Sequence, residues 1–555
     1  MSSYLLAAEA DKIQDLLFRS ARLREVVGGS QLLSRFCEQG AEALLQKHKG
    51  NPKDDLIVND GGAFRILFHG DHARDTAIKF GNDLAELYRR CTGGSLTVAE
   101  PVPYDPPAFD KANTEAHDEL RKAKNRGDIA ASVLHLPFTA FCASCGMGMA
   151  IHHKSRFEED VTERPNYLCQ SCINKAVERD RQEGLQTDVG FLDRFRETIW
   201  KQAGWNEGEY PLRRPDGGDW TEAIAKFDPK RYVAYLLADG NAMGAVFKQC
   251  SSKEKMRALS LALSQSLRAA LAEPCVELLK RQLRQEDKDV LPVLPLILGG
   301  DDLFALLPAP WALDYAARFC SAYEENMKTA LTKVGLFDPN KPPIPTIAAA
   351  VVICKANYPY MLAHQRGEKL LAHAKEIARR LQIEREKYFS TLNFEVITGN
   401  QLGRVPDAKI KGHYPSLRPY FVSSTPLPEA GLSVEKILKH RLELKYLPNK
   451  RRAEFEQFYD PADFQNKDFN EDEWLPGFQG LRSRIARSES LSKKLRQALI
   501  DLGDEAQAEK GYWKRLSLPR KRNDQGYHGH GLPDLLMMWS YAHKLDESLS
   551  KYAGE

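Results

Sequence analysis

The chain has 555 residues, of which 43% are hydrophobic and 28% charged, and its formal net charge is +3. This length predicts several domains, and the small net charge argues against tight autonomous binding to nucleic acid. No apolar run is long enough for a membrane helix, the N-terminus lacks the basic lead-in of a signal peptide, and ten cysteines do not suggest a disulfide scaffold. We therefore expect a cytoplasmic protein with no membrane partner.

The first predicted elements are an apolar strand and a hairpin. The strand is YLLAA at residues 4–8, and the sequence LIVNDGGAFRILF at residues 56–68 places two apolar arms around paired glycines. Paired glycines between apolar arms are typical of a β-turn. The pattern after the hairpin predicts a helix, a strand, a second helix and a strand, at His72–Arg90, Ser95–Glu100, Phe109–Lys124 and Val133–Phe138.

Four cysteines form two Cys-x-x-Cys pairs in the next segment. They are Cys142, Cys145, Cys169 and Cys172. Four thiolates close a tetrahedral shell around zinc, so the pattern predicts a structural zinc site with no ligand position left for water. A redox pair is the alternative, but redox chemistry needs only one such pair.

The order of elements then repeats. YLLAD at residues 235–239 matches YLLAA, and the hairpin LPLILGGDDLFALLP at residues 294–308 matches the first hairpin. A strand, helix, hairpin, helix and strand in this order predict a ferredoxin-like palm, so we expect an α+β protein with two such domains. The later elements of the second copy are expected at Trp311–Lys333, Thr346–Lys355, Tyr360–Leu381 and Thr391–Thr398.

The two copies differ at acidic positions. Asp239, Asp301 and Asp302 of the second copy stand where the first has Ala8, Ala63 and Phe64. Adjacent carboxylates repel one another unless a cation lies between them. Carboxylates that converge from neighbouring strands suit two Mg²⁺ or Mn²⁺ ions and in-line displacement at phosphorus. The simpler alternative is a hairpin with a polar tip.

Further residues of the second copy are candidates for nucleotide binding. Gly240, Asn241 and Gly244 follow Asp239 where the chain enters a helix, and Gly299 and Gly300 leave room above the hairpin. Backbone N–H groups at such glycines approach phosphates closely. Lys375 is placed to reach phosphate, although a solvated helix lysine is an equally good interpretation.

From about Pro426 the sequence is helical and strongly charged, with little strand character. Its basic clusters, such as Lys450-Arg451-Arg452, are typical either of RNA contacts or of solvated helix faces. The segment GYHGHGLPD at residues 526–534 is rich in glycine and histidine, and we expect a flexible loop there.

Taken together, these motifs resemble the large subunit of type III CRISPR effector complexes, especially the Cmr type. The resemblance rests on FRSARLREVVGGSQLL, the four-cysteine insert, YLLADGNAMG, LILGGDDLFALLP and the close of the second palm. It implies synthesis of cyclic oligoadenylate from ATP when target RNA binds, with Asp239, Asp301 and Asp302 as the metal site. It also implies partners: other subunits of the ribonucleoprotein, guide RNA and target RNA.

Two features depart from this family. Asn241 stands where many members have an acidic residue, which puts the second metal in doubt. Many members also begin with an HD nuclease domain, whereas the single HD dipeptide here, His117-Asp118, lies in a charged run that predicts a solvated helix. We therefore expect no intrinsic DNase activity.

The predicted organisation is a degenerate palm at 1–139, a zinc-binding insert and helical linker at 140–228, a catalytic palm at 229–425 and a helical domain at 426–555. Three other functions remain open. The same palm could act as a GGDEF-like nucleotide cyclase, it could join AMP from ATP to another acceptor such as S-adenosylmethionine, or the chain could be a ribonucleoprotein scaffold without chemistry.

Overall fold

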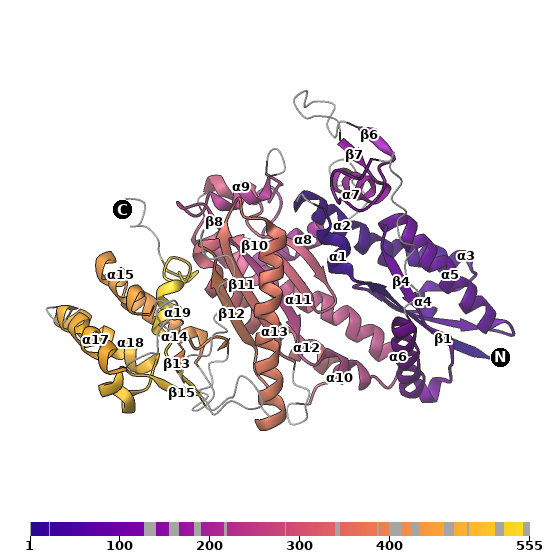
Figure 1. Ribbon diagram of the computed structural model, residues 1–555. Coiled ribbons are helices and arrows are strands. Elements are labelled where there is room, and N and C mark those ends of the chain that lie inside the picture. The colour runs from indigo at the N-terminus through magenta and orange to yellow at the C-terminus, as the bar shows by residue number, and fades with distance from the viewer. Residues whose placement is uncertain are drawn as a thin grey trace.

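Figure 1 shows the arrangement of a computed structural model, with an N-terminal sheet, a larger central sheet and a C-terminal group of helices. None of the helices in the described part of the chain is both long and apolar enough to cross a bilayer. The structure describes residues 2–20, 23–126, 140–154, 166–181, 190–215, 219–283, 285–338, 345–385, 388–398, 413–414, 416–422, 432–459, 471–485, 488–516 and 527–547.

The N-terminal sheet has the strand order β2-β3-β1-β4, with antiparallel neighbours and β5 paired to β1. This is the ferredoxin-like order, as the sequence predicts. The predicted strand Val133–Phe138 lies outside the described residues. The elements are β1 (Ser3–Asp11), α1 (Ile13–Phe18), α2 (Leu23–Arg35), η1 (Phe36–Gly40), α3 (Ala41–Lys47), α4 (Pro52–Asp55), β2 (Leu56–Asp60), β3 (Ala63–His69), α5 (Ala73–Thr92), β4 (Ser95–Val98), β5 (Val102–Pro103), η2 (Pro106–Ala108) and α6 (Phe109–Arg126).

Both faces of this sheet are buried, because successive residues of a strand point to opposite sides. Leu5 and Ala7 of β1 belong to the large core that continues into the central domain. Leu6 and Ala8 belong to a separate core, which also contains Phe80 of α5. One face of the first palm's sheet therefore packs into a core of its own, and the other packs into the core that it shares with the central domain.

The four-cysteine insert is a small unit that lies beside the first palm in Figure 1. It consists of the antiparallel pair β6 (His152–Lys154) and β7 (Asn166–Leu168), followed by α7 (Gln170–Arg181). The helices α8 (Phe191–Ala203) and α9 (Trp220–Ala225) lead from it to the central sheet.

The central sheet has the order β14-β12-β11-β8-β10-β9. Strands β11, β8, β10 and β9 repeat the order of the first palm, and β12 adds to β11 in parallel. The second predicted palm is therefore present. Its elements are β8 (Tyr232–Gly240), α10 (Met243–Lys248), α11 (Lys253–Arg281), η4 (Gln285–Asp289), β9 (Leu294–Gly299), β10 (Asp302–Pro308), η5 (Ala309–Trp311), α12 (Ala312–Val334), β11 (Ile347–Lys355), α13 (Tyr360–Arg385), β12 (Thr391–Val396) and β14 (Tyr420–Phe421).

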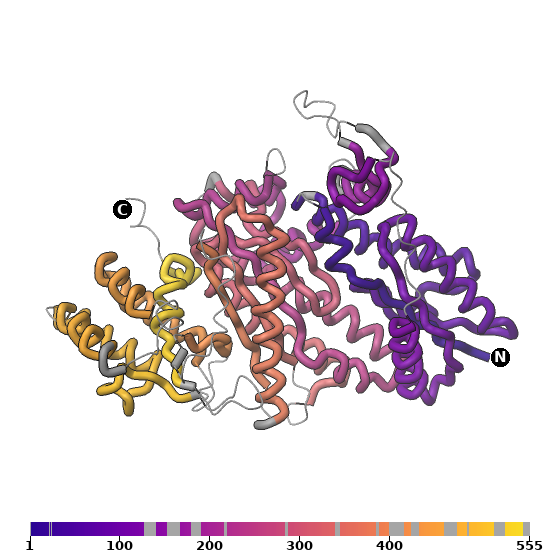
Figure 2. Tube along the Cα trace, in the orientation of Figure 1, coloured from indigo at the N-terminus to yellow at the C-terminus, as the bar shows by residue number. Residues whose placement is uncertain are grey.

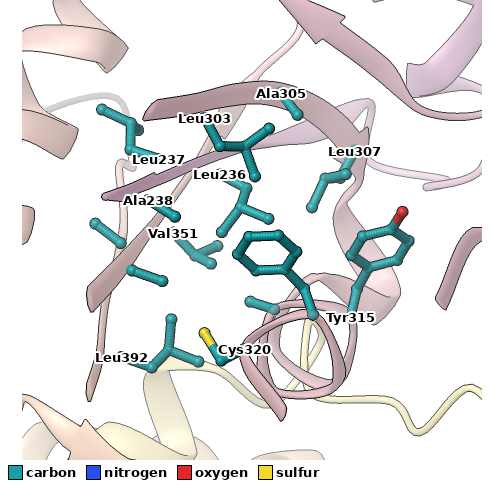
Figure 3. Packing of buried hydrophobic residues seen from close by; sticks show 14 of the residues in the cluster. Leu236, Leu237, Ala238, Leu303, Ala305, Leu307, Tyr315, Cys320, Val351 and Leu392 are labelled. Atoms are coloured by element: carbon teal, nitrogen blue, oxygen red, sulfur yellow. The ribbon is translucent and has the colours of Figure 1, made fainter. Parts of the chain in front are cut away.

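Helices cover both faces of the central sheet. Figure 3 shows Leu236 of β8 and Val351 of β11, which are register partners, packed with Tyr315 and Cys320 of α12. On the opposite face α13 contacts β8. Because both faces are covered, β8 and β11 read as continuous apolar runs rather than as alternating ones.

The C-terminal region lies on the far side of the central sheet from the first palm, as the chain trace in Figure 2 shows. Its elements are α14 (Val434–Glu443), α15 (Asn449–Phe458), α17 (Glu471–Ile485), α18 (Glu489–Asp501), η6 (Glu505–Lys510), α19 (Leu532–Met537), and a small sheet of β13 (His413–Tyr414), β16 (Tyr527–Gly529) and β15 (Lys514–Leu516). The mostly helical structure of this region agrees with the prediction from the sequence, but the small sheet was not predicted.

The expectation of a flexible loop at residues 526–534 is wrong for the part described. Tyr527–Gly529 form β16, and His530 is fully buried. The glycines serve close packing there rather than flexibility. A Cβ on Gly529 would lie 2.5 Å from Leu417 Cδ2, and one on Gly531 would lie 2.9 Å from the Tyr420 hydroxyl.

Candidate functional site

The three predicted carboxylates come together at the tip of the second hairpin. Asp302, the first residue of β10, is the register partner of Asp239 on β8. Asp301 occupies the turn that Gly300 makes with a φ of +60°, a conformation that favours glycine. A Cβ on Gly240, next to Asp239, would lie 3.1 Å from Asp301 Cβ. The hairpin geometry thus places all three side chains at one end of the sheet.

This end of the sheet carries more negative charge than the protein compensates. Burial, and then repulsion by Asp239, raises the pKa of Asp301 to about 6. Burial and the charges of Asp239 and Asp301 raise the pKa of Asp302 to about 7. Half-buried carboxylates that destabilise one another in this way are typical of sites that hold a cation or a proton during function.

Helix α13 brings a cation and a further acid to the same place. Gly367 allows the helix to lie directly on β8, because a Cβ there would overlap the side chain of Leu237 at 2.3 Å. Lys375 forms an ion pair with Asp239. The charges of Asp239 and Lys375 also act on Glu368, whose pKa is raised by burial and by Asp239 and lowered by Lys375.

Lys375 thus contacts a carboxylate in this structure, and its predicted role at phosphate stays a prediction. Its side chain is 37% exposed, so the amine has room to turn toward a ligand. Loss of Lys375 from the Asp239 ion pair would leave the three carboxylates with less compensating charge.

A cavity of about 520 Å³ lies beside the carboxylates, between the two palms. The second palm contributes its hairpin tip, and the first palm contributes the start of α1 and the tip of its own hairpin. The lining residues are Glu9, Ala10, Lys12, Ile13, Gln14, Asp15, Val58, Asp60, Gly61, Ala63, Phe247, Ser260, Leu263, Gly299, Gly300, Asp301 and Asp302. A cavity of this size accommodates a small-molecule ligand.

The two hairpin tips approach each other at their glycines. A Cβ on Gly61 would lie 3.3 Å from the backbone nitrogen of Gly300 and 3.4 Å from its Cα. Gly61 also has a φ of +58°. Gly61 is thus favoured by this close approach as well as by its turn, whereas Gly300 is favoured by its positive φ alone, because a Cβ there would meet nothing within 4 Å.

The other predicted nucleotide-binding residues have different surroundings. Gly299 and Gly300 line the cavity, whereas Gly240, Asn241 and Gly244 are not among its described lining residues. The Asn241 side chain donates to the Thr346 hydroxyl at 3.1 Å, and its backbone N–H donates to the Thr346 carbonyl at 2.8 Å. Asn241 thus fixes the turn after β8 to the start of β11. A Cβ on Gly244 would meet nothing within 4 Å, so its surroundings leave room.

The first palm repeats the geometry of the hairpin without its acids. Phe64 is the register partner of Ala8, as Asp302 is of Asp239. Ala8 and Phe64 are fully buried in the core of the first palm. The correspondence expected from the sequence is therefore found in the register, and the first hairpin carries no carboxylate at these two positions.

Sequence reasoning missed the residues that the first palm and α13 contribute. Gln14 lines both the large cavity and a smaller one with Asp239, Asp302 and Glu368. Glu368 lies seven positions before Lys375, which puts both on one side of a helix. That spacing is a signal in the sequence. Gln14 has no comparable signal, because its place depends on how the two palms pack.

The four cysteines form the second candidate site. Their sulfur atoms all lie within 4.8 Å of one another. Among the residues that the structure describes, no other group of three or more His, Cys, Asp or Glu ligand atoms is as compact, and the three aspartates are more widely spaced. Four converging thiols fit a tetrahedral zinc shell, so the cluster is compatible with a zinc ribbon.

The comparison with known families decides what the second palm is. Residues 232–383 match the family model described as Cas10/Cmr2, second palm domain. Residues 232–383 therefore form a Cas10/Cmr2 palm. The match contains Asp239, Asp301, Asp302, Glu368 and Lys375, and it confirms the resemblance stated from the sequence.

Several solved structures are also similar to the chain, at low sequence identity. A Csm1–Csm4 cassette in complex with cA4 is 14% identical, with a TM-score of 0.44, over 72% of this chain and 55% of that chain. A cassette in complex with AMPPNP is 15% identical, with a TM-score of 0.42, over 68% and 54%. Csm1 in T. onnurineus is 13% identical, with a TM-score of 0.42, over 68% and 51%. The chain thus spans about half the length of these solved chains. No curated protein matches the sequence.

Proposed function

We propose that the chain is the large subunit of a type III CRISPR effector and that its second palm converts ATP to cyclic oligoadenylate when target RNA binds. The observation that carries this proposal is the pairing of Asp302 with Asp239 across two strands, with Asp301 beside them and with Asp301 and Asp302 lining the cavity between the palms. The match of residues 232–383 to the Cas10/Cmr2 second palm supports the same function.

The reaction class follows from the donor set. The 3′-hydroxyl of one ATP attacks the α-phosphorus of another, a P–O bond forms, and the bond to the leaving pyrophosphate breaks. The hydroxyl proton leaves to solvent or a carboxylate. Proximity and charge supply most of the catalysis in such transfers. The cavity would admit the reacting ends of the two nucleotides, with residues of both palms in its wall.

The residues fit a pair of Mg²⁺ or Mn²⁺ ions. Carboxylate oxygens are the preferred ligands, and burial, followed by repulsion between the carboxylates, raises the pKa values of Asp301 and Asp302, which supports a cation beside them when they are ionised. Asp239, Asp301 and Asp302 would hold the ions, which when bound activate the attacking hydroxyl and neutralise the pyrophosphate. Glu368 adds charge nearby, and Lys375 is the residue that can move from Asp239 to a phosphate.

The cysteine cluster would hold a structural Zn²⁺ in this proposal. Its four thiols would leave no coordination position open for a substrate or water. The zinc would therefore hold the insert together rather than take part in catalysis. The partners would be the other subunits, the guide RNA and the target RNA of a cytoplasmic ribonucleoprotein.

Target-bound complex and labelled ATP test this function directly. The complex is incubated with and without S-adenosylmethionine, and the products are identified by mass spectrometry. We expect cyclic oligoadenylate from the wild type and none from a complex that carries Asp301→Ala and Asp302→Ala, with subunit assembly unchanged. An adenylated S-adenosylmethionine would replace the proposed product, and equal ATP turnover by the variant would contradict catalysis by this palm.

A further inference from the structure

Helix α7 joins the cysteine cluster to the first palm. It begins between the ligand candidates Cys169 and Cys172, and its side chains reach the end of α5. Ser171 Oγ donates to the Thr92 carbonyl at 2.5 Å, and Asn174 Nδ2 donates to the Cys91 carbonyl at 2.7 Å. These bonds satisfy carbonyl groups that the last turn of a helix leaves without partners.

One residue of α7 reaches deeper. Lys175 is 2% exposed, and its Nζ donates to the backbone carbonyl of Leu16 in α1 at 2.5 Å. The lysine stem crosses α2 at Gly29, where a Cβ would lie 3.4 Å from Lys175 Cε and 2.8 Å from Leu17 Cδ2. A charged amine buried this deeply costs free energy unless a specific partner compensates it.

The other side of α1 faces the catalytic palm. Gln14 and Asp15 line the cavity between the palms, beside the hairpin tip of the second palm. Phe18, at the end of α1, packs against Phe304 of β10 and His364 of α13, with ring centroids 5.2 Å and 4.0 Å away. Helix α1 is only six residues long, so it depends on its neighbours for its position.

We propose that Lys175 is a positioning residue that couples the four-cysteine centre to the cavity between the palms, through the Leu16 carbonyl and α1. Closure of the cysteine shell fixes the first turn of α7, and Lys175 transmits that position to α1. The cavity wall formed by Gln14 and Asp15 then keeps its place beside Asp301 and Asp302. The structural link stands on the contacts above, whereas its effect on catalysis rests on the proposed function.

Hydrogen exchange of the full-length chain tests the structural link. Lys175→Met keeps the buried stem and removes the amine. We expect exchange of the peptide covering residues 12–19 to accelerate about tenfold, because a hydrogen bond from a charged donor is lost. Zinc content should stay at the wild-type value. Unchanged exchange in this peptide would overturn the proposal.

Three variants sharpen the test. Asn174→Ala loosens the contact of α7 with α5 but leaves the Leu16 contact, so exchange at residues 12–19 should stay at the wild-type rate. Lys493→Met makes the same substitution at a side chain that is 75% exposed and should change nothing. Gly29→Ala presses on Leu17 of the same peptide, because its Cβ would lie 2.8 Å from Leu17 Cδ2 but 3.4 Å from Lys175 Cε; it should accelerate exchange with the lysine intact and serves as the positive control. An equal acceleration in Asn174→Ala would show general loosening of the insert and would overturn the specific role of Lys175.

Steady-state kinetics of the target-bound complex test the catalytic consequence. Lys175→Met should raise the KM for ATP about tenfold and change kcat less than about twofold, because α1 lines the cavity and carries none of the three aspartates. A lower kcat with unchanged KM would overturn this coupling. If the wild-type complex makes no nucleotide product, the proposed function fails, while the hydrogen-exchange result still decides the structural link.

Discussion

Asp302 lies directly opposite Asp239 on the neighbouring antiparallel strand, and Phe64 lies opposite Ala8 at the same place in the first palm. The two palms therefore share the same strand pairing, but the second palm alone carries carboxylates at these two positions. Phe64 is fully buried, whereas Asp301 and Asp302 are half-buried, but their surroundings and the charge of Asp239 still make these two carboxyl groups costly to ionise. That cost is the physical basis of the first prediction.

Asp302→Asn should separate activity from stability. The folded pKa of about 7 lies above the ordinary value of 3.8, so in magnesium-free buffer the wild type loses stability as pH rises from about 4 to 7. The variant lacks this loss, and its Tm at pH 8 should exceed that of the wild type by about 2–4 °C. Calorimetry measures the Tm, and product formation should fall by about 10³-fold. A lower Tm at pH 8 would contradict the electrostatic account, and Asp110→Asn on an exposed face of α6 serves as the control.

Lys375→Gln distinguishes two roles for the amine that contacts Asp239. If Lys375 turns to a phosphate when ATP binds, the variant should raise the KM for ATP about tenfold through loss of a charge-assisted hydrogen bond. We expect this result from initial rates measured across ATP concentrations at saturating magnesium. An unchanged KM together with a lower magnesium requirement would instead show that the amine only competes with the metal for Asp239.

His364 should make the packing of the two palms sensitive to acid. It lies between Phe18 and Phe304, and burial lowers its pKa from 6.5 to about 4. Below pH 6.5 the unfolded chain gains a proton that the folded one excludes, so up to about 3 kcal/mol of stability is lost as pH falls to 4.

The variant His364→Phe should show a smaller fall in Tm than the wild type between pH 7 and 5. Thermal unfolding followed by circular dichroism measures this difference. His530 and His543 are also buried with lowered pKa values, but they titrate equally in both proteins and cancel in the comparison. Parallel pH profiles of the two proteins would contradict the role of His364.

Gly61→Ala should disturb the contact between the hairpin tips. The new Cβ would press on Gly300, and a positive φ of +58° adds strain of about 1 kcal/mol. Gly335→Ala is the matched control, since Gly335 has a φ of +70° and open space around its Cβ position. We expect Gly61→Ala to lower the Tm more than the control and to reduce product formation. Equal effects of the two variants would mean that the contact between the tips contributes nothing.

Cys169→Ser should remove the metal of the four-cysteine centre. We expect about one zinc per wild-type chain by elemental analysis, and less than about a tenth of that in the variant, because a three-thiol site is much weaker. Cys250→Ala, at a buried cysteine outside the cluster, should retain the metal. Zinc retained in Cys169→Ser at the wild-type level would contradict the four-ligand site.

The sequence predicts much of this architecture because several signals agree. The repeat of strand, hairpin and helix gives the ferredoxin-like order in both palms, and the paired glycines give the register that brings Asp302 to Asp239. Local spacing is also enough to predict the cysteine cluster, because the four cysteines occur as two Cys-x-x-Cys pairs. In each case the information lies within one segment or in its repetition.

The missed features depend on packing between distant segments. Gln14 and Asp15 reach the cavity only because the first palm sits against the second. Lys175 looks like an ordinary helix lysine in the sequence, and its burial follows from the packing of α7 against α2, which is far away in the chain. The glycines near His530 suggest mobility by composition, whereas they relieve crowding around Leu417 and Tyr420.

The unequal pair of hairpins sets how a product ring is built under the proposed function. Ala8 and Phe64 leave the first hairpin inert at the positions that Asp239 and Asp302 occupy in the second. Each chain then joins one phosphodiester at a time at a single centre. The growing oligomer must place its new end at the same aspartates after every bond. Ring closure therefore depends on whether the oligomer rebinds there before it dissociates.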